Sequence, residues 1–168
     1  MKKTLEVVNG LKEHGIIEEY AIGGAIAALK WTEPFFTRDL DLFIIPEKKV
    51  GSEELLVLSS VYDYLKAKGY DTWTGQWLMI EEIPVEFIPA EGVAEEAVVN
   101  AVETVFEGVQ TRVISPEYLI ALFLKASREK DIVKIRMLLD QATVDIDHVK
   151  DIVRRYGLSD RFERFANE

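Results

Sequence analysis

Two aspartates, Asp39 and Asp41, stand two positions apart in an otherwise strongly apolar run. The alternation and the large apolar side chains predict a β-strand over residues 39–45, which Pro46 ends. Side chains at positions i and i+2 of a strand point to the same face, about 6.6–6.8 Å apart. Two carboxylates on one face repel each other unless a cation lies between them. The pair therefore indicates either a metal site or a solvent-exposed strand end, and the spacing alone does not choose between them.

A Gly23-Gly24 pair lies upstream, between an expected strand over residues 20–22 and an expected helix over residues 25–30. Glycine lets backbone amides approach a phosphate closely, and the start of a helix favours a negative charge. A Gly-Gly pair is also common in plain turns. Its place, one loop before the acidic strand, indicates that phosphate donors and metal ligands belong to one supersecondary unit.

Glu86 interrupts a second apolar segment, residues 84–88. A lone acid there lies either on an exposed strand face or beside the aspartate pair. In the second case three carboxylates could hold two metal ions about 3.5–4 Å apart, the arrangement used for in-line displacement at phosphorus. Mg²⁺ suits such a site because it prefers carboxylate, phosphate and water oxygens. The chain has no cysteine, which excludes a thiolate site.

Helical and extended patterns alternate along the rest of the chain. Two or three strands are expected within residues 70–87, and a hairpin through Glu107-Gly108 joins strands over residues 104–106 and 109–114. Ser115 and Pro116 are typical of a helix start. Helices are expected at 4–14, 53–68, 94–100, 117–127, 131–141 and 147–156, with a short one near Arg161. The pattern predicts an α/β (α+β) fold, in which a mixed β-sheet core flanked by helices (residues 1–114) precedes a C-terminal helical part (residues 115–168).

The charge of the chain is distributed unevenly. Residues 1–110 hold 9 basic and 20 acidic residues, while residues 111–168 hold 11 basic and 10 acidic ones. Non-specific binding of nucleic acid needs a basic protein, so this composition disfavours it, although a local basic surface in the C-terminal third stays open. No apolar run is long enough to cross a bilayer, and Glu6 and Asn9 interrupt the N-terminal apolar stretch. A cytoplasmic location is expected.

The run Ile22-Gly23-Gly24-Ala25, followed by Thr37-Arg38-Asp39-Leu40-Asp41-Leu42, resembles the signature of the DNA polymerase β-type nucleotidyltransferases. The more specific likeness is to the abortive-infection (AbiEii-like) nucleotidyltransferases, many of which are toxins of toxin–antitoxin pairs. A C-terminal signature also fits, since residues 116–122 lead into Lys125 and the run 126–131. The resemblance covers roughly residues 17 to 140.

This resemblance implies a metal-dependent enzyme that transfers a nucleoside monophosphate (NMP) from an NTP to an acceptor hydroxyl and releases pyrophosphate. The acceptor would be a tRNA 3′ end, a protein or a small molecule, and an antitoxin is a possible partner. Asp39, Asp41 and Glu86 would be the catalytic residues and the ligands of two Mg²⁺ ions. The implied nucleotide-binding residues are Gly23, Gly24, Thr37, Lys125, Lys130 and Asp131.

Two departures from the family pattern leave room for an alternative, against which the intact set of three acids argues. The third acid is Glu86 where Asp is more usual, and Lys134 stands where the family often has an acid. The alternative is a catalytically inactive nucleotide-binding or partner-binding module that retains the fold.

Several nearby side chains have a simpler interpretation. Arg128 and Lys130 are expected to be solvated between two helices, and Arg38 is expected on the strand face opposite Asp39. The aromatic residues of the intervening loop either stack on a base or, more commonly, pack in the core; they are Trp31, Phe35 and Phe36.

Overall fold

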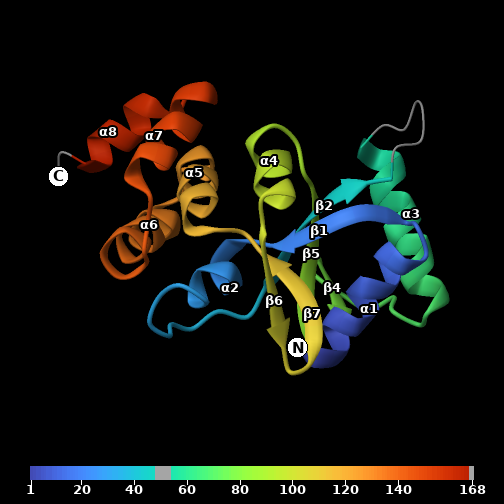
Figure 1. The fold of residues 1–168 in the computed structure, drawn as a ribbon. Helices are drawn as coiled ribbons and strands as arrows, with labels where there is room; N and C mark the ends of the chain where they lie inside the picture. The colour runs from blue at the N-terminus through green and yellow to red at the C-terminus, as the bar shows by residue number, and fades with distance from the viewer. Residues whose placement is uncertain (48–53, 167–168) are drawn as a thin grey trace.

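The computed structural model describes residues 1–47 and 54–166. Within them the chain forms a seven-stranded mixed sheet and eight helices (Figure 1). This confirms the predicted fold class. The elements are α1 (Lys2–Glu13), β1 (Ile17–Ile22), α2 (Gly24–Leu29), β2 (Leu40–Pro46), α3 (Glu54–Ala67), β3 (Trp73–Thr74), β4 (Trp77–Ile80), β5 (Ile83–Pro89), α4 (Val93–Val99), β6 (Val102–Phe106), β7 (Val109–Val113), α5 (Pro116–Ala126), α6 (Glu129–Gln141), α7 (Ile146–Arg155) and α8 (Ser159–Ala166).

The strand order is β3-β4-β5-β2-β1-β7-β6. The β2–β5 and β1–β7 pairs are parallel and the other pairs are antiparallel. β1 and β2 lie at the centre, and their apolar side chains, such as Leu40, Leu42 and Ile44, are fully buried. The acidic strand therefore lies inside the sheet, with a paired strand on each side.

Helices cover both faces of the sheet. Figure 1 shows α1 and α3 on the right of the sheet, with α2 and the C-terminal helices α5–α8 on its left. α5 packs against α2, α4, α6 and α7. Its side chains are buried almost all round because neighbours surround it, which explains the apolar run from Tyr118 to Leu124. This helix joins the sheet to the C-terminal helices.

The helix and strand boundaries differ from expectation by a few residues, for local reasons. The strand after residue 38 begins at Leu40 rather than Asp39, since Leu40 is the first residue of β2 that pairs with β5. The helix expected from Asp131 begins at Glu129, because the Asp131 carboxylate accepts a hydrogen bond from the backbone N–H of Arg128 and so caps the first turn. The segment 70–87 holds three strands, and the hairpin turns through Glu107 and Gly108 with φ values of 49° and 82°. Within the described residues, no helix is both long and apolar enough to span a membrane.

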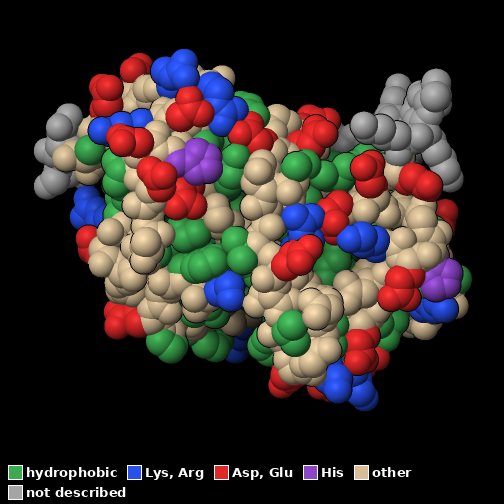
Figure 2. All heavy atoms as spheres, viewed as in Figure 1, with side chains coloured by type: hydrophobic (Ala, Val, Ile, Leu, Met, Phe, Trp, Pro, Cys, Tyr) green, Lys and Arg blue, Asp and Glu red, His purple; other side chains and the backbone are tan. Residues whose placement is uncertain are grey.

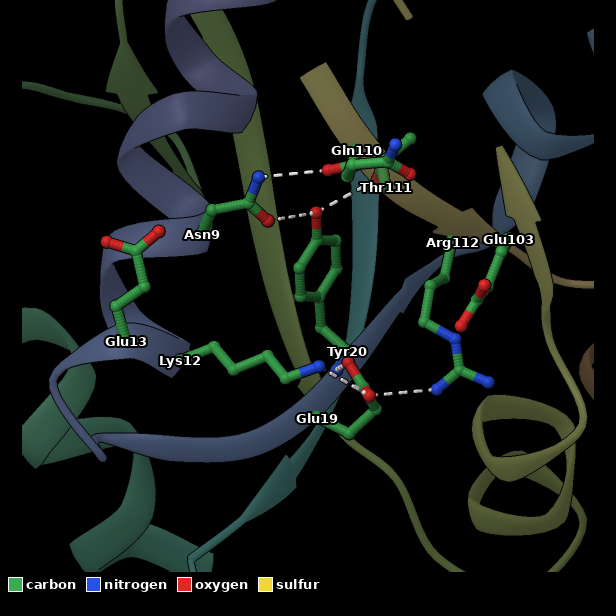
Figure 3. A pocket seen from close by; sticks show the side chains of 9 residues that line it. All are labelled: Asn9, Lys12, Glu13, Glu19, Tyr20, Glu103, Gln110, Thr111 and Arg112. Atoms are coloured by element: carbon green, nitrogen blue, oxygen red, sulfur yellow. Dashed lines mark hydrogen bonds and ion pairs between the residues drawn. The ribbon is translucent and has the colours of Figure 1, made fainter. Parts of the chain in front are cut away.

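A pocket of about 370 Å³ lies between α1, β1 and the β6–β7 hairpin (Figure 3). The Tyr20 hydroxyl donates to Asn9 at 2.8 Å and bonds with Thr111 at 3.0 Å. Glu19 accepts from both cations of the pocket, Lys12 at 2.7 Å and Arg112 at 3.0 Å. These contacts link the N-terminal helix and the β6–β7 hairpin to β1, although the buried Nε of Arg112 has no hydrogen-bond partner. None of the expected site residues lies in this pocket.

Candidate active site

The parallel pairing of β2 with β5 places Asp41 directly opposite Glu86. Partners in a ladder point to the same face of the sheet, so the two carboxylates face the same side. Asp39, one residue before β2, lines a hollow together with both. The structure therefore brings all three expected acids to one place. Among the described residues, however, no three acidic or histidine side chains already stand in an arrangement that could hold a metal ion.

The Gly-Gly turn packs directly against the acidic strand. Gly24 has φ +58°, and a Cβ atom there would lie 1.9 Å from Oδ2 of Asp41. A Cβ atom on Gly23 would lie 2.4 Å from Cε2 of Phe43, and the Gly23 N–H donates to the Asp41 carbonyl at 2.9 Å. Only glycine permits this approach. The backbone after β1 and the Asp41 carboxylate thus share one wall of the site.

The carboxylate of Asp41 lies in an unfavourable electrostatic environment. Burial, and then the negative charges of Glu86 and Asp39, raise the pKa of Asp41 to about 6, although Arg128 and Lys130 oppose the shift. Burial and neighbouring like charge both disfavour the charged form of an acid. A cation between these carboxylates would relieve that repulsion.

Arg128 reaches the acids from the start of α6. Its guanidinium donates to both oxygens of Asp131, at 2.7 Å from Nε and 3.2 Å from Nη2, and its backbone N–H donates to Oδ2 at 3.3 Å. The Asp131 side chain is 0% exposed, whereas that of Arg128 is 56% exposed. Asp131 therefore acts on the cleft through the arginine that it orients.

Two adjoining hollows meet at the acids. Asp41, Gln76, Glu86, Phe123 and Arg128 line both. The first, here called the aromatic hollow, has a volume of about 460 Å³ and is also lined by Phe35, Phe36, Arg38, Lys130 and Lys134. The second, called the apolar hollow, has a volume of about 540 Å³ and is also lined by Phe43, Ile88, Pro89, Leu119 and Leu122. One cleft thus offers two compartments with the acids between them.

A protein-family model described as "Nucleotidyl transferase of unknown function (DUF2204)" matches residues 1–160. The chain belongs to this family. It is therefore a nucleotidyltransferase, as the Gly-Gly turn and the paired acids predict. No curated protein sequence matches the chain.

Solved structures support the fold of this nucleotidyltransferase. The antibiotic-resistance factor ANT(2″)-Ia, determined in solution, superposes with a TM-score of 0.54 at 15% identity, over 98% of this chain and 94% of that one. A crystal structure of ANT(2″)-Ia in complex with adenylyl-2″-tobramycin gives a TM-score of 0.52 at 16% identity, over 94% of this chain and 98% of that one. At 15–16% sequence identity, the likeness shows a shared fold and nothing finer.

The remaining expected residues of the nucleotidyltransferase divide between the two hollows. Thr37, Lys130 and Asp131 line the aromatic hollow. Gly24 and Lys125 line the apolar hollow, in which Lys125 is exposed. Gly23 lines neither hollow. It precedes Gly24 in the turn and packs against Phe43 of β2.

Two expectations about arginines are wrong. Arg128 is not merely solvated, since it pairs with Asp131 and lines both hollows. Arg38 is not on the opposite side from Asp39; it lines the aromatic hollow with it, because both residues precede the first residue of β2 and strand alternation does not apply there. No sequence motif identifies Arg128, because Arg-x-x-Asp lacks the Ser or Thr that begins a capping box, and only the structure shows its pairing with the buried Asp131.

The loop aromatics divide between core and cleft. The Trp31 indole donates to the Ile114 carbonyl at 3.2 Å, and both Trp31 and Phe35 pack against the core. Phe36 is 81% exposed and lies 5.1 Å from the Arg38 guanidinium. Core packing is confirmed for the first two, and Phe36 remains free to stack. Gln76, Trp77 and Lys134 also line the aromatic hollow, although sequence patterns did not single them out as contacts.

Proposed function

We propose that this chain transfers an NMP from an NTP to the hydroxyl of an acceptor in a Mg²⁺-dependent reaction, with Asp39, Asp41 and Glu86 as the metal ligands. The observation that carries the proposal is the Asp41–Glu86 pairing against Gly24. Placing Glu86 beside Asp41 against a glycine turn has no structural benefit of its own, since the negative charge of Glu86 raises the cost of charging Asp41.

The residues present fit Mg²⁺ in chemistry. All three are carboxylates, whose hard oxygens suit this ion, and the electrostatic repulsion around Asp41 calls for a cation. The three are not pre-arranged as a closed site, so we infer that phosphate and water oxygens complete the coordination. Two ions bound here would neutralise the phosphates and lower the pKa of the acceptor hydroxyl.

The nucleotide fits the aromatic hollow best. Four cations line it, namely Arg38, Arg128, Lys130 and Lys134. Arg128 is held with its guanidinium plane fixed by Asp131, which suits a phosphate. Phe36 offers an exposed ring on which a base of any kind can stack. We infer that Gly23, Gly24 and Thr37 lie close to the triphosphate.

The acceptor then enters from the apolar hollow, where Lys125 would approach the triphosphate from the opposite side. Its hydroxyl oxygen attacks the α-phosphorus, the bond from that phosphorus to the bridging oxygen of the β-phosphate breaks, and pyrophosphate leaves. Asp41 or Glu86, which line both hollows, takes the hydroxyl proton as general base.

Among the three acceptor classes, a small molecule has the most support. The apolar hollow has the size of a small-molecule site. On the face shown in Figure 2, basic side chains are interspersed with acidic ones rather than gathered in the track that RNA needs. ANT(2″)-Ia, which has the same fold, was crystallised with an adenylylated small molecule. A tRNA 3′ end or a protein hydroxyl remains as the other outcome of the test below.

The test is incubation with each of the four NTPs, labelled at the α-phosphate, with Mg²⁺ and a cell lysate separated into small molecules, RNA and protein. We expect metal-dependent label in the small-molecule fraction and release of pyrophosphate. The variant Glu86→Gln should abolish both, while Asp140→Asn, at an exposed acid of α6, should abolish neither. Mg²⁺-dependent NTP binding without label in any fraction would overturn the proposed transfer.

The AbiEii-like subtype, an antitoxin partner and a cytoplasmic location are finer parts of the same proposal. The subtype and the antitoxin partner rest on the resemblance of residues 22–25, 37–41 and 117–131. The location is the one expected for a chain with no cysteine and no apolar run of bilayer length. Controlled expression should arrest growth of a bacterial host, and Asp41→Asn should relieve the arrest. Growth at the normal rate with a fully active protein would contradict a toxin role and leave the transfer activity standing.

A further inference from the structure

The two edges of the sheet differ in what they expose. One edge is β3, which has only two residues. The other is β6, which pairs with β7 over five consecutive residues without a break in register (Figure 1). Natural proteins commonly protect an edge with a very short strand, a bulge, proline or lysine. Of these, β3 has shortness. β6 has none within its own five residues, although Glu103 is charged and Lys30, which follows α2, donates to Thr104 Oγ1 at 3.2 Å.

Large apolar side chains concentrate at the β6 edge. Four of the exposed large hydrophobic residues lie within eight positions, Val99 at 60% exposure, Val102 at 38%, Val105 at 56% and Phe106 at 42%. Val102 and Phe106 share one face of the strand, and Val105 lies on the other. Isolated exposed apolar residues need no explanation, but three within one five-residue edge strand, Val102, Val105 and Phe106, are typical of an interface.

The free backbone groups of β6 can be identified from the hairpin. Glu107 and Gly108 form a two-residue turn, so Phe106 and Val109 are the closing pair. Residues that flank such a turn exchange hydrogen bonds, and the pattern alternates along the strand. Phe106, Thr104 and Val102 therefore bond to β7, while the N–H and C=O groups of Glu103 and Val105 point outward. The other strands of the described ranges leave this edge without a neighbour.

We propose that two copies of this chain pair through β6, antiparallel, about a twofold axis at Thr104. In this register Glu103 of each copy faces Val105 of the other, which matches the two residues whose backbone groups point outward. Four backbone hydrogen bonds form, and the two sheets continue into one. Each Val102 meets the other copy's Phe106, an aromatic–β-branched pair of the kind that stabilises sheets. The register also keeps the two Glu103 carboxylates from lying opposite each other.

Charge substitution tests this register. Analytical ultracentrifugation of the intact chain should give twice the mass of one chain. A dilution series should then give the dissociation constant of the dimer. Val105→Glu places a glutamate opposite Glu103 of the other copy in both pairs, so the dissociation constant should rise by roughly 10- to 30-fold. Adding Glu103→Lys to Val105→Glu makes both pairs opposite in charge and should restore the dimer. Thr74→Glu, on the exposed β3 edge, is the matched control and should leave the mass unchanged.

Several outcomes would overturn the proposal. One is a monomer at every concentration, and another is a dimer that Val105→Glu does not weaken. Failure of the double variant to recover the dimer, although circular dichroism shows it folded, would exclude the Glu103–Val105 register. Nucleotide transfer is not part of this test, because β6 lines neither hollow of the cleft. The interface and the proposed function therefore stand or fall separately.

Discussion

Two acids of this chain, Glu96 and Asp41, have opposite surroundings. Glu96 on α4 accepts hydrogen bonds from Arg155 at 2.7 Å to each oxygen, from Tyr118 at 2.8 Å and from Tyr156. These partners, Arg155 first, lower the pKa of Glu96 to about 2. Asp41 lies instead beside Glu86 and Asp39, and its pKa is raised to about 6.

The difference shows what each acid contributes. The partners of Glu96 come from α5 and α7, so a fully satisfied carboxylate joins α4 to the C-terminal helices. The Asp41 side chain faces acids and a glycine turn, and its charge is balanced only from a distance by Arg128 and Lys130. An acid that the protein satisfies stabilises the fold, whereas one left facing other acids has capacity for an external cation. Each prediction below tests that contrast.

The largest effect is expected for Asp41→Asn. Transfer activity should fall by more than about 100-fold, the scale found when a single group that stabilises the transition state is removed. The melting temperature should stay the same or rise, because the substitution removes a repulsion with Glu86. Turnover assays and thermal unfolding measure the two quantities. If Asp41→Asn and Asp39→Asn both unfolded the protein, these acids would have a structural role and the contrast would fail.

Gly24→Ala should damage both stability and activity. The new Cβ would lie 1.9 Å from Oδ2 of Asp41, and φ +58° disfavours any side chain there. A side chain at such a φ value lowers the free energy of unfolding by on the order of 1–3 kcal/mol. Displacement of the Asp41 carboxylate by the new Cβ adds to this loss. Urea unfolding measures the loss of stability. Gly108→Ala, at a glycine with φ +82° and nothing near the added Cβ, controls for backbone strain alone. Equal losses in the two variants would show that contact with Asp41 is unimportant.

Asp131→Asn should act on nucleotide binding more than on the chemical step. It removes the charged partner that orients Arg128, and a charge-assisted hydrogen bond contributes about 1.5–3 kcal/mol. We expect the KM for NTP to rise roughly 10- to 100-fold, which is the same free energy expressed as affinity. Steady-state kinetics measure KM and kcat separately. A fall in kcat at unchanged KM would assign Asp131 a direct role in the chemistry.

Glu96→Gln should give the smallest effect, confined to stability. A folded-state pKa below the ordinary value of 4.5 stabilises the protein above that pH, and the contribution is lost as pH falls from about 4.5 towards about 2. The variant lacks this contribution, so its melting temperature should be lower by roughly 2–8 °C near pH 7 and should depend less on pH within that window. Scanning calorimetry across the window measures it. Transfer activity at 25 °C should not change.

Much of the fold could be predicted from the sequence, because its signals are local. The glycine pair, the apolar runs and the Glu107-Gly108 turn fix φ values or strand faces from neighbouring residues alone, and the elements they predict are present. The division at residues 114 and 115 stays a prediction, and the structure shows that α5, just after it, packs on α2 and α4 of the preceding part. Residues 48–53 lie outside the described residues, and so does the expected helix start at residue 53.

The site was predictable in part. The acidic pair in one apolar run could be interpreted directly, although only Asp41 lies in β2 and Asp39 precedes its first residue. The role of Arg128 could not be predicted, because it depends on the buried carboxylate of Asp131. The charge of Arg128 alone indicates a solvated side chain. The prediction for Arg38 is wrong because it applies strand alternation to a residue two positions before Leu40, where β2 begins.

The sequence by itself determined the kind of chemistry, namely three carboxylates, a glycine turn and a set of nearby cations. The tertiary structure decided which of these groups meet. Only the parallel pairing of β2 with β5 sets Glu86 opposite Asp41, since residues 45 positions apart carry no local signal of their register. Only the packing of α6 brings Arg128 to the same acids and leaves Asp131 fully buried beneath it. Strand pairing and helix packing depend on how segments far apart in the sequence bury their apolar side chains together. No short segment contains that information.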